Sequence, residues 1–264
     1  MSEDHLVVGV VGGVGTITLN RPAKRNAVTY DMWVALASAC RRLAADPEVR
    51  VVVLRGAGHH FCAGADITEL LAERAPGAAT FMHVNMACEH ALATLPKPTI
   101  AVVHGDCVGG GCALAIDCDM RLAVDGARFG ITPAKLGIVY PPASLERAVR
   151  LLGPAAKRLL FTGDLIDAVE AHRIGLADEL LGADVIESRL GELCATLTQR
   201  SLLTQAAAKE MIDAVTEHGV VSADLADTWA REVTLSGEMA EGVAAFEERR
   251  APIFPWRGRG NTQS

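Results

Sequence analysis

The sequence has few aromatic side chains and a deficit of positive charge. Phe, Trp and Tyr make up 4% of the 264 residues, which argues weakly against a large stacking pocket for ring-shaped substrates. Lys and Arg total 25 against 32 Asp and Glu, for a net charge of −7. Binding nucleic-acid phosphates needs a basic stripe, and only the short tail Arg257–Arg259 is basic. We therefore expect no nucleic-acid partner.

A long uninterrupted apolar run is also lacking. The longest nearly uncharged stretch, residues 98–116, contains His104, Asp106 and four glycines. A membrane span of ~20 apolar residues would not tolerate that interruption. The first five residues carry acids where a secretory signal peptide carries a basic segment. We expect a cytoplasmic protein with no membrane partner.

The cysteines show no pattern typical of a disulfide framework or a zinc site. There are seven, an odd number, and no two of them form a C-x-x-C pair. The neighbouring His59 and His60 have no third ligand at metal spacing. We expect reduced, mostly buried thiols and no metal site.

The first half of the sequence alternates predicted strands and helices. β-Branched runs around Gly12-Gly13 predict a hairpin over residues 6–19. Thr29 is placed to cap a helix that ends before Asp46-Pro47. Apolar runs at 49–54 and 98–103 predict strands of a sheet covered on both faces, and residues 66–95 have helical character.

The order strand, glycine-rich turn, helix occurs twice and predicts an α/β fold of stacked right-handed units. The second unit has a helix from about residue 112 and a strand over 119–124. From Pro154 onward the spacing of apolar residues predicts helices only, the last over 241–250. We expect a core over residues 1–195 and a helical region over 196–264.

Two glycine-rich turns, residues 61–67 and 105–112, are the first candidates for chemistry. Each leaves backbone N–H groups free where a strand gives way to a helix N-terminus, a place that favours an anion. Two such turns on adjacent strands can aim two donors at one oxygen, the geometry of an oxyanion hole. The alternative is that small residues only allow close packing. Neither turn has the spacing of a Walker or Rossmann phosphate loop.

Five motifs in order carry a resemblance to a known family. They are Asn20-Arg21-Pro22-x-x-x-Asn26-Ala27, Phe61-Cys62-Ala63-Gly64-Ala65-Asp66-Ile67, Lys97-Pro98-x-Ile100-Ala101, Gly109-Gly110-Gly111-Cys112 and Cys118-Asp119. Together they resemble the enoyl-CoA hydratase/isomerase (crotonase) superfamily from about Leu6 to the helical tail.

The resemblance implies a crotonase (ClpP-like) spiral of ββα units. Its C-terminal helices would form a homotrimer or a dimer of trimers. The substrate would be an acyl-CoA, with coenzyme A as part of the substrate and no separate cofactor. By matching position, the backbone N–H groups of Ala65 and Gly110 would form the oxyanion hole for the thioester. The CoA moiety would lie along five residues: Ala23, Lys24, Arg25, Ala63 and Ile67.

The sequence departs from the hydratase pattern at two positions. Hydratases of the family have glutamates where Ala113 and Pro133 stand here. Hydration needs one group to activate water and another to move a proton to the α-carbon, and neither alanine nor proline can do this. We therefore expect weak or no hydration of crotonyl-CoA.

The segment Thr132-Pro133-x-x-Leu136-Gly137-x-x-Tyr140 resembles that of methylmalonyl-CoA decarboxylase. That enzyme, however, has a histidine where Ala65 stands. The sequence predicts a decarboxylase-like lyase in which Tyr140 orients a carboxylate or supplies a proton. Glu146 and Asp117 are further candidate acids. A hydratase or isomerase with a non-standard acid, and a catalytically silent acyl-CoA-binding protein, are the alternatives.

Overall fold

A computed structural model describes residues 5–73 and 75–259. The strands are β1 (Leu6–Val11), β2 (Val14–Leu19), β3 (Val51–Gly56), β4 (Thr99–Val103), β5 (Asp106–Val108), β6 (Met120–Val124), β7 (Arg128–Gly130), β8 (Ile166–Asp167) and β9 (Glu179–Leu181). The helices are α1 (Tyr30–Ala45), α2 (Phe81–Ala93), α3 (Gly110–Asp117), α4 (Pro142–Leu152), α5 (Ala155–Thr162), α6 (Ala168–Arg173), α7 (Ile186–Gln199), α8 (Leu202–His218), α9 (Ala223–Ser236) and α10 (Glu238–Glu247). Single 3-10 turns are η2 (Pro22–Lys24), η3 (Ile67–Glu69) and η4 (Pro133–Lys135).

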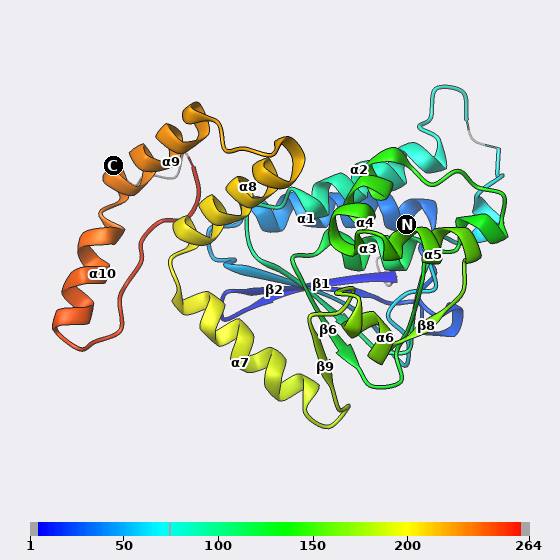
Figure 1. Cartoon of the computed structure of the whole chain (residues 1–264), viewed down its shortest axis with the longest axis horizontal. Coiled ribbons are helices and arrows are strands. Elements are labelled where there is room, and N and C mark those ends of the chain that lie inside the picture. Colours follow the sequence, from blue (N-terminus) through cyan, green and yellow to red (C-terminus); the bar gives the residue numbers. More distant parts are fainter. Residues whose placement is uncertain (1–4, 74, 260–264) are drawn as a thin grey trace.

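The main sheet has six strands in the order β1-β2-β3-β4-β6-β9. β1 and β2 form the predicted antiparallel hairpin, and every other neighbouring pair is parallel. Helices lie on both sides of the sheet, with α1 to α4 on one side and α7 on the other (Figure 1). The parallel strands and their connecting helices make the α/β architecture that the sequence predicted.

Both faces of the central strands β3 and β4 are buried, and alternate residues of each strand point to opposite sides. Val52 and Leu54 of β3 belong to the large core beneath α1 and α2. Val51 and Val53 belong to a second core that includes Leu190 of α7. A continuous run of valines therefore suits β3, since neither face meets water.

Helix α1 begins where the sequence predicted. The Thr29 side chain accepts a hydrogen bond from the Met32 N–H at 3.2 Å, which satisfies one of the free donors of the first turn. The apolar positions predicted for this helix, among them Leu36 and Cys40, are fully buried.

Three expectations about secondary structure were wrong in detail. Of the helical segment expected over 66–95, the described residues form η3 and the shorter helix α2. The region after Pro154 is not purely helical, because it contributes β8 and β9. These strands have two and three residues, too few to give a readable periodicity. Strand β3 is also shifted two residues toward the C-terminus of the predicted run.

A smaller sheet of β5, β7 and β8 stacks successive turns of the chain on one another. Cys62 forms a parallel bridge with Cys107, and Cys107 pairs in turn with Phe129 of β7. The Cys62 N–H donates to the Asp106 carbonyl at 2.9 Å, and the Val108 N–H donates to the Cys62 carbonyl at 2.9 Å. These bonds fix how the two glycine-rich turns face each other.

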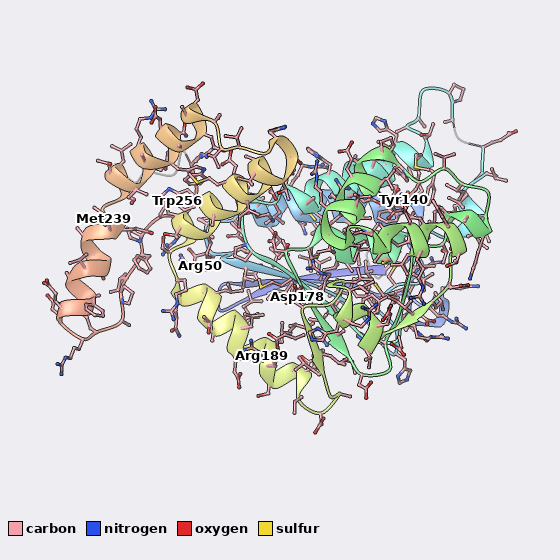
Figure 2. The ribbon with its side chains drawn as sticks, viewed as in Figure 1. Arg50, Tyr140, Asp178, Arg189, Met239 and Trp256 are labelled. Carbon is pink, nitrogen blue, oxygen red and sulfur yellow. The ribbon has the colours of Figure 1, made fainter. Side chains whose placement is uncertain are left out.

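The C-terminal helices carry a small core of their own. Trp229 and Trp256 pack with ring centroids 6.0 Å apart, beside Leu202, Leu203 and Ala206. Met239 and Trp256 lie on the opposite side of the molecule from Tyr140 (Figure 2). Helix α7, which spans residue 195, packs on the main sheet through Ile186, Leu190 and Cys194 and leads into α8. In the described part of the chain, no helix has the length and apolar character needed to span a membrane.

Candidate active site

The stacking of the two glycine-rich turns brings together the backbone at residues 65 and 110. Each lies three residues beyond a member of the Cys62–Cys107 bridge, and the two segments run parallel. A Cβ atom added at Gly110 would lie 3.4 Å from the Ala65 nitrogen. Two segments far apart in the sequence thus contribute neighbouring backbone nitrogens.

The Ala65 N–H is available to a ligand. Val28 hydrogen bonds to the residues on either side of Ala65. Its N–H donates to the Gly64 carbonyl at 2.8 Å, and its carbonyl accepts from the Asp66 N–H at 2.9 Å. In a parallel bridge the N–H of the central residue then points to the other side. Among the described residues, the Ala65 N–H has no protein acceptor.

Gly110 supplies the second N–H from the first position of α3. The N–H groups of a first helical turn have no acceptor within the helix, and the helix dipole adds partial positive charge there. The fully buried indole of Trp33 closes one side of the turn. A side chain at position 110 would approach the Trp33 ring to 3.2 Å and crowd Ala65, so glycine keeps this space open.

Gly64 shapes the turn before Ala65. Its φ is +100°, a conformation that residues with a side chain rarely adopt. A Cβ atom there would come within 2.8 Å of the Val108 carbonyl and 3.2 Å of the Gly110 nitrogen. Glycine at position 64 is therefore required both by the turn and by the close approach of the two donors.

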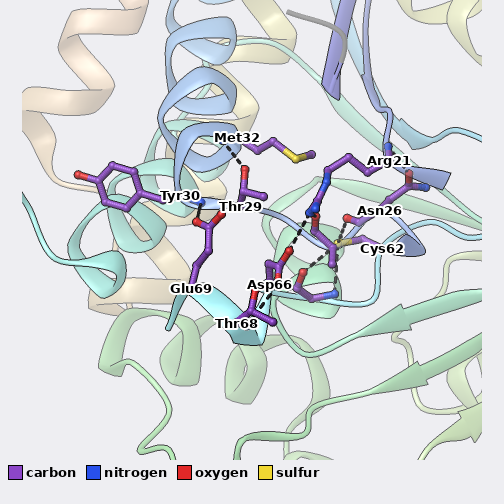
Figure 3. Close-up of polar contacts among 11 residues, drawn as sticks. Arg21, Asn26, Thr29, Tyr30, Met32, Cys62, Asp66, Thr68 and Glu69 are labelled. Carbon is purple, nitrogen blue, oxygen red and sulfur yellow. Dashed lines mark hydrogen bonds and ion pairs between the residues drawn. The ribbon is translucent and has the colours of Figure 1, made fainter. Parts of the chain in front are cut away.

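The loop expected to carry CoA is fixed to the same turns by Asn26. This side chain is fully buried, and its Nδ2 donates to the carbonyls of Ala57 at 2.9 Å and His60 at 2.6 Å. Its Oδ1 accepts from the Arg21 N–H at 2.9 Å, and the Arg21 side chain reaches Asp66 at 3.0 Å (Figure 3). These hydrogen bonds of the buried Asn26 amide hold the loop against the two glycine-rich turns.

The five residues expected along CoA gather around this unit. Ala23 and Lys24 are exposed on η2, and Arg25 follows in the left-handed conformation, with φ +49°. The Arg25 carbonyl accepts a hydrogen bond from the Ala63 N–H at 2.9 Å. Ile67 is exposed at the start of η3. Their positions on one exposed edge suit the role that the resemblance implies, which stays a prediction.

A nearly buried carboxylate holds two arginines at this edge. Asp106 contacts the Arg25 guanidinium at 3.2 Å and the Arg128 guanidinium at 2.6 Å, while both arginine side chains remain more than half exposed. Its backbone N–H donates to Nδ1 of His60 at 3.1 Å. The edge of the candidate CoA site therefore presents positive charge on an ordered support.

The two positions where the resemblance implies glutamates in hydratases hold no acid. Ala113 is buried in the first turn of α3, and Pro133 begins η4. Asp117 lies one turn further along α3 from Ala113, on the same side of the helix. Its side chain is buried and forms an ion pair with Arg147 of α4, with 2.5 Å between Oδ1 and Nε.

Arg147 also pairs with Glu89 of α2, at 3.2 Å between Nη2 and Oε2. Glu89 further accepts hydrogen bonds from Ser144 and, at 3.0 Å, from Asn85. Two buried carboxylates thus share one guanidinium. We call Glu89, Asp117 and Arg147 the buried triad.

Burial is the main cause of the altered acidity in the triad. It raises the pKa of Asp117 well above its usual range, and the negative charge of Glu89 adds to this while Arg147 opposes it. Burial likewise raises the pKa of Glu89, against the hydrogen bond from Ser144 and the charge of Arg147. Moving a charge out of water costs free energy, so the binding of one proton by this pair of acids is favoured.

Tyr140 precedes α4 (Figure 2), and the charges of all three triad residues act on its hydroxyl. Its ring is half-buried against the main core, but its hydroxyl is fully buried and has no hydrogen-bond partner among the described residues. Burial raises the pKa of this hydroxyl, and the neighbouring Cys112, Glu89 and Asp117 raise it further. Cys112 places the hydroxyl near the first turn of α3, the turn that begins at Gly110.

Glu146 lies away from this arrangement. Its side chain is 63% exposed, and it pairs only loosely with Arg150, at 3.6 Å. Helix α4 begins four residues before it, at Pro142. Asp119 has a structural role, because its carboxylate accepts from the Thr99 N–H at 2.8 Å and pairs with Lys209 at 2.9 Å.

The remaining polar candidates form no metal centre in the described part of the chain. His60 is occupied with Asp106, and His104 hydrogen bonds to the Gly58 carbonyl at 3.0 Å. All seven cysteines are buried free thiols, as expected.

Glu89, Arg147 and Trp33 were not predicted from the sequence as residues of the site. A signal was present, because Glu89 stands among buried positions of α2 such as Val84, Cys88 and Leu92. A charge on a buried helix face needs a partner, and the partner here lies on another helix, which no local pattern identifies.

The chain is similar to known proteins over nearly its whole length. The family model for enoyl-CoA hydratase/isomerase matches residues 10–258. A probable enoyl-CoA hydratase of Mycobacterium leprae is 35% identical over 259 residues, which cover 97% of this chain and 100% of the relative. The 2,3-dehydroadipyl-CoA hydratase of Escherichia coli is 31% identical over 260 residues, covering 97% and 100%.

Solved structures give the same result for the fold. An enoyl-CoA hydratase/isomerase family member has a TM-score of 0.87 and 37% identity, covering 96% of this chain and 98% of the other. An enoyl-CoA hydratase/carnithine racemase of Magnetospirillum magneticum has a TM-score of 0.89 and 33% identity, covering 96% of both chains. The fold is the crotonase fold, and the chain belongs to the enoyl-CoA hydratase/isomerase family.

Proposed function

We propose that the protein binds an acyl-CoA, holds the enolate of its thioester with the N–H groups of Ala65 and Gly110, and removes a carboxylate as carbon dioxide. The pair of neighbouring backbone N–H groups carries the first part of this proposal. One such donor is worth roughly 2.7–4 kcal/mol of transition-state stabilisation. Membership of the family supports an acyl-CoA as the substrate class.

The side chains around the donors favour decarboxylation over hydration. Hydration needs an ionised base to activate water and a second group to deliver a proton. Ala113 and Pro133 can do neither, and the nearest described carboxylates on α2 and α3 are buried against Arg147. Loss of carbon dioxide leaves an enolate that needs only the oxyanion donors and a proton source. Tyr140, with its unpartnered hydroxyl, is the candidate source.

Hydration by a non-standard acid is the second candidate. The observation in its favour is that several relatives of comparable length are named enoyl-CoA hydratases, at about 31–37% identity. A silent acyl-CoA-binding protein would keep the same backbone donors and lack turnover. Fold and family do not decide among these reactions.

Turnover of a small panel tests the proposal. We would incubate wild type and Tyr140→Phe with methylmalonyl-CoA, crotonyl-CoA and a medium-chain enoyl-CoA, and follow the products by mass spectrometry. We expect carbon dioxide from methylmalonyl-CoA, slowed about 100-fold or more in Tyr140→Phe, because general acids contribute roughly 10²–10⁴.

Efficient hydration of crotonyl-CoA by wild type would contradict the proposal and favour a substitute acid. Tight binding of every thioester without turnover would favour the binding protein. Equal rates of carbon dioxide release in wild type and Tyr140→Phe would support decarboxylation but show that Tyr140 does not supply the proton.

We also propose that the C-terminal helices associate with copies of the same chain. Exposed apolar side chains gather there, including Leu235, Met239, Val243 and Phe246, the last 85% exposed. Apolar patches of this kind mark interaction surfaces. The molecular mass in solution, measured by light scattering, would be a multiple of 27.8 kDa if the proposal holds.

A further inference from the structure

We infer that Asp117 is the proton store of the active site, passing its proton to Tyr140 after Tyr140 has protonated the substrate enolate. This inference rests on the proposed decarboxylation and assigns a role to residues that the family pattern leaves aside. Asp117 is a positioning residue here, since it acts through Tyr140 and not on the substrate.

The first observation is a pair of orphaned oxygens. The Tyr140 hydroxyl and Oδ2 of Asp117 are both fully buried, and neither has a hydrogen-bond partner among the described residues. Leaving such a group unpaired costs about 1–3 kcal/mol. Glu89, Asp117 and Arg147 act electrostatically on the Tyr140 hydroxyl, and Arg147 Nε is a third buried atom of this region without a hydrogen-bond partner in the described part of the chain. Such a group of unpartnered polar atoms indicates a partner that they share, either one another after a small side-chain rotation or one bridging water.

The second observation is the charge balance around Asp117. Glu89 and Asp117 carry two potential negative charges against the single positive charge of Arg147. Glu89 is also held by Ser144 and Asn85, whereas Asp117 has Arg147 as its one ion-pair partner among the described residues. The proton that neutralises the triad therefore resides on Asp117, the acid with fewer donors to stabilise its ionised form.

The other groups packed around Asp117 do not compete for this role. They are the thiols of Cys40, Cys88 and Cys118, from α1, α2 and the end of α3. Burial raises the pKa of each thiol, so all three stay neutral near pH 7. Arg147, on α4, remains the only positive charge facing Asp117 within the described residues.

The proton transfers balance in two steps. The Tyr140 O–H bond breaks as a C–H bond forms at the α-carbon of the enolate, which leaves a phenolate. The Asp117 O–H bond then breaks and the Tyr140 O–H bond re-forms. Arg147 stabilises the resulting Asp117 carboxylate. This carboxylate then takes a proton from solvent water, which supplies the one proton that each decarboxylation consumes.

Two variants separate a proton store from a purely structural acid. In Asp117→Asn we expect kcat for methylmalonyl-CoA to fall about 100-fold, with KM little changed, because the proton step alone is affected. In wild type, kcat should fall as rising pH removes the Asp117 proton. In the matched variant Glu89→Gln the same fall should begin at lower pH, since a negative charge that favours the protonated form is gone.

The stereochemistry of the product gives a second readout. In D₂O, wild type should deliver deuterium to one face of the α-carbon in the product formed from methylmalonyl-CoA. Asp117→Asn should deliver deuterium to both faces, because water replaces Tyr140 as the proton donor. An acid that only supported the fold would change neither this ratio nor the pH at which kcat falls.

Infrared spectroscopy reads the proton without any substrate. A buried protonated carboxyl gives a C=O stretching band, which we expect in wild type at pH 7 and not in Asp117→Asn. Absence of that band in folded wild type overturns the inference even if Asp117→Asn fails to fold. Unchanged kcat, pH profile and stereochemistry in a folded Asp117→Asn overturn it as well. Failure of wild type to release carbon dioxide overturns the proposed function instead.

Discussion

The candidate oxyanion turns and the buried triad lie at the two ends of helix α3 and are built in opposite ways. The turns offer backbone N–H groups held by small residues, and Gly64 and Gly110 contribute by having no side chain. The triad consists of charged side chains from three helices, α2, α3 and α4. The turns stabilise charge through fixed dipoles, whereas the triad stores charge that can change with pH.

This difference explains what each region tolerates. Backbone donors depend on the path of the chain, so the turns are sensitive to shape and insensitive to side-chain chemistry. The triad is sensitive to the balance of charge, because an unpaired buried ion is expensive. Substitutions that alter shape in one region and charge in the other should therefore give different losses.

The largest expected effect comes from closing the oxyanion turn. In Gly64→Ala the new methyl group would lie 2.8 Å from the Val108 carbonyl and force the turn to shift. We expect kcat to fall about 10²–10³-fold, the cost of losing one oxyanion donor. The control is Gly126→Ala, which has a φ of +83° and no atom within 4 Å of its added Cβ. If both variants lose equal activity, backbone strain and not the donor geometry would be responsible.

The next effect concerns stability. Arg147→Met leaves the carboxyl groups of Glu89 and Asp117 without their shared counter-charge. We expect the free energy of unfolding to drop by about 3–5 kcal/mol, measured by urea denaturation near pH 7. Adding Glu89→Gln and Asp117→Asn to Arg147→Met should recover most of the loss. A triple variant no more stable than Arg147→Met would show that the arginine acts through packing and not through charge.

The smallest effect is expected at Glu146. Its side chain is 63% exposed and its partner Arg150 also pairs with Glu217 at 2.9 Å. Glu146→Gln should change the unfolding free energy by less than about 0.5 kcal/mol and leave kcat unchanged. Loss of turnover in this variant would return Glu146 to the candidate acids and weaken the case for the buried triad.

The sequence was sufficient for the features that depend on local pattern. The opening hairpin, the Thr29 cap and the strand at Thr99–Val103 follow from spacing and turn residues. The two candidate donors could be proposed because glycine-rich turns between strand and helix are recognisable in the sequence. Their approach to one another was an expectation, and the Cys62–Cys107 bridge supplies its physical cause.

The parts that escaped prediction depend on contacts between distant segments. Asp117 was considered only for its spacing from Ala113, and its partners Glu89 and Arg147 were not found. They lie 28 and 30 residues away along the chain, on separate helices. The short strands β8 and β9 were missed for a related reason, since two or three residues form a strand only because a neighbouring strand is present.

The proposal that backbone N–H groups are the oxyanion donors has a consequence for mutational screens. Ala65 is already an alanine, and truncating side chains leaves every backbone nitrogen in place. An alanine scan would therefore find the triad and Tyr140 while passing over Ala65 without a signal. Replacing single peptide bonds by esters, through chemical ligation of the chain, would remove one N–H at a time. Only that kind of substitution measures what the amide at Ala65 contributes.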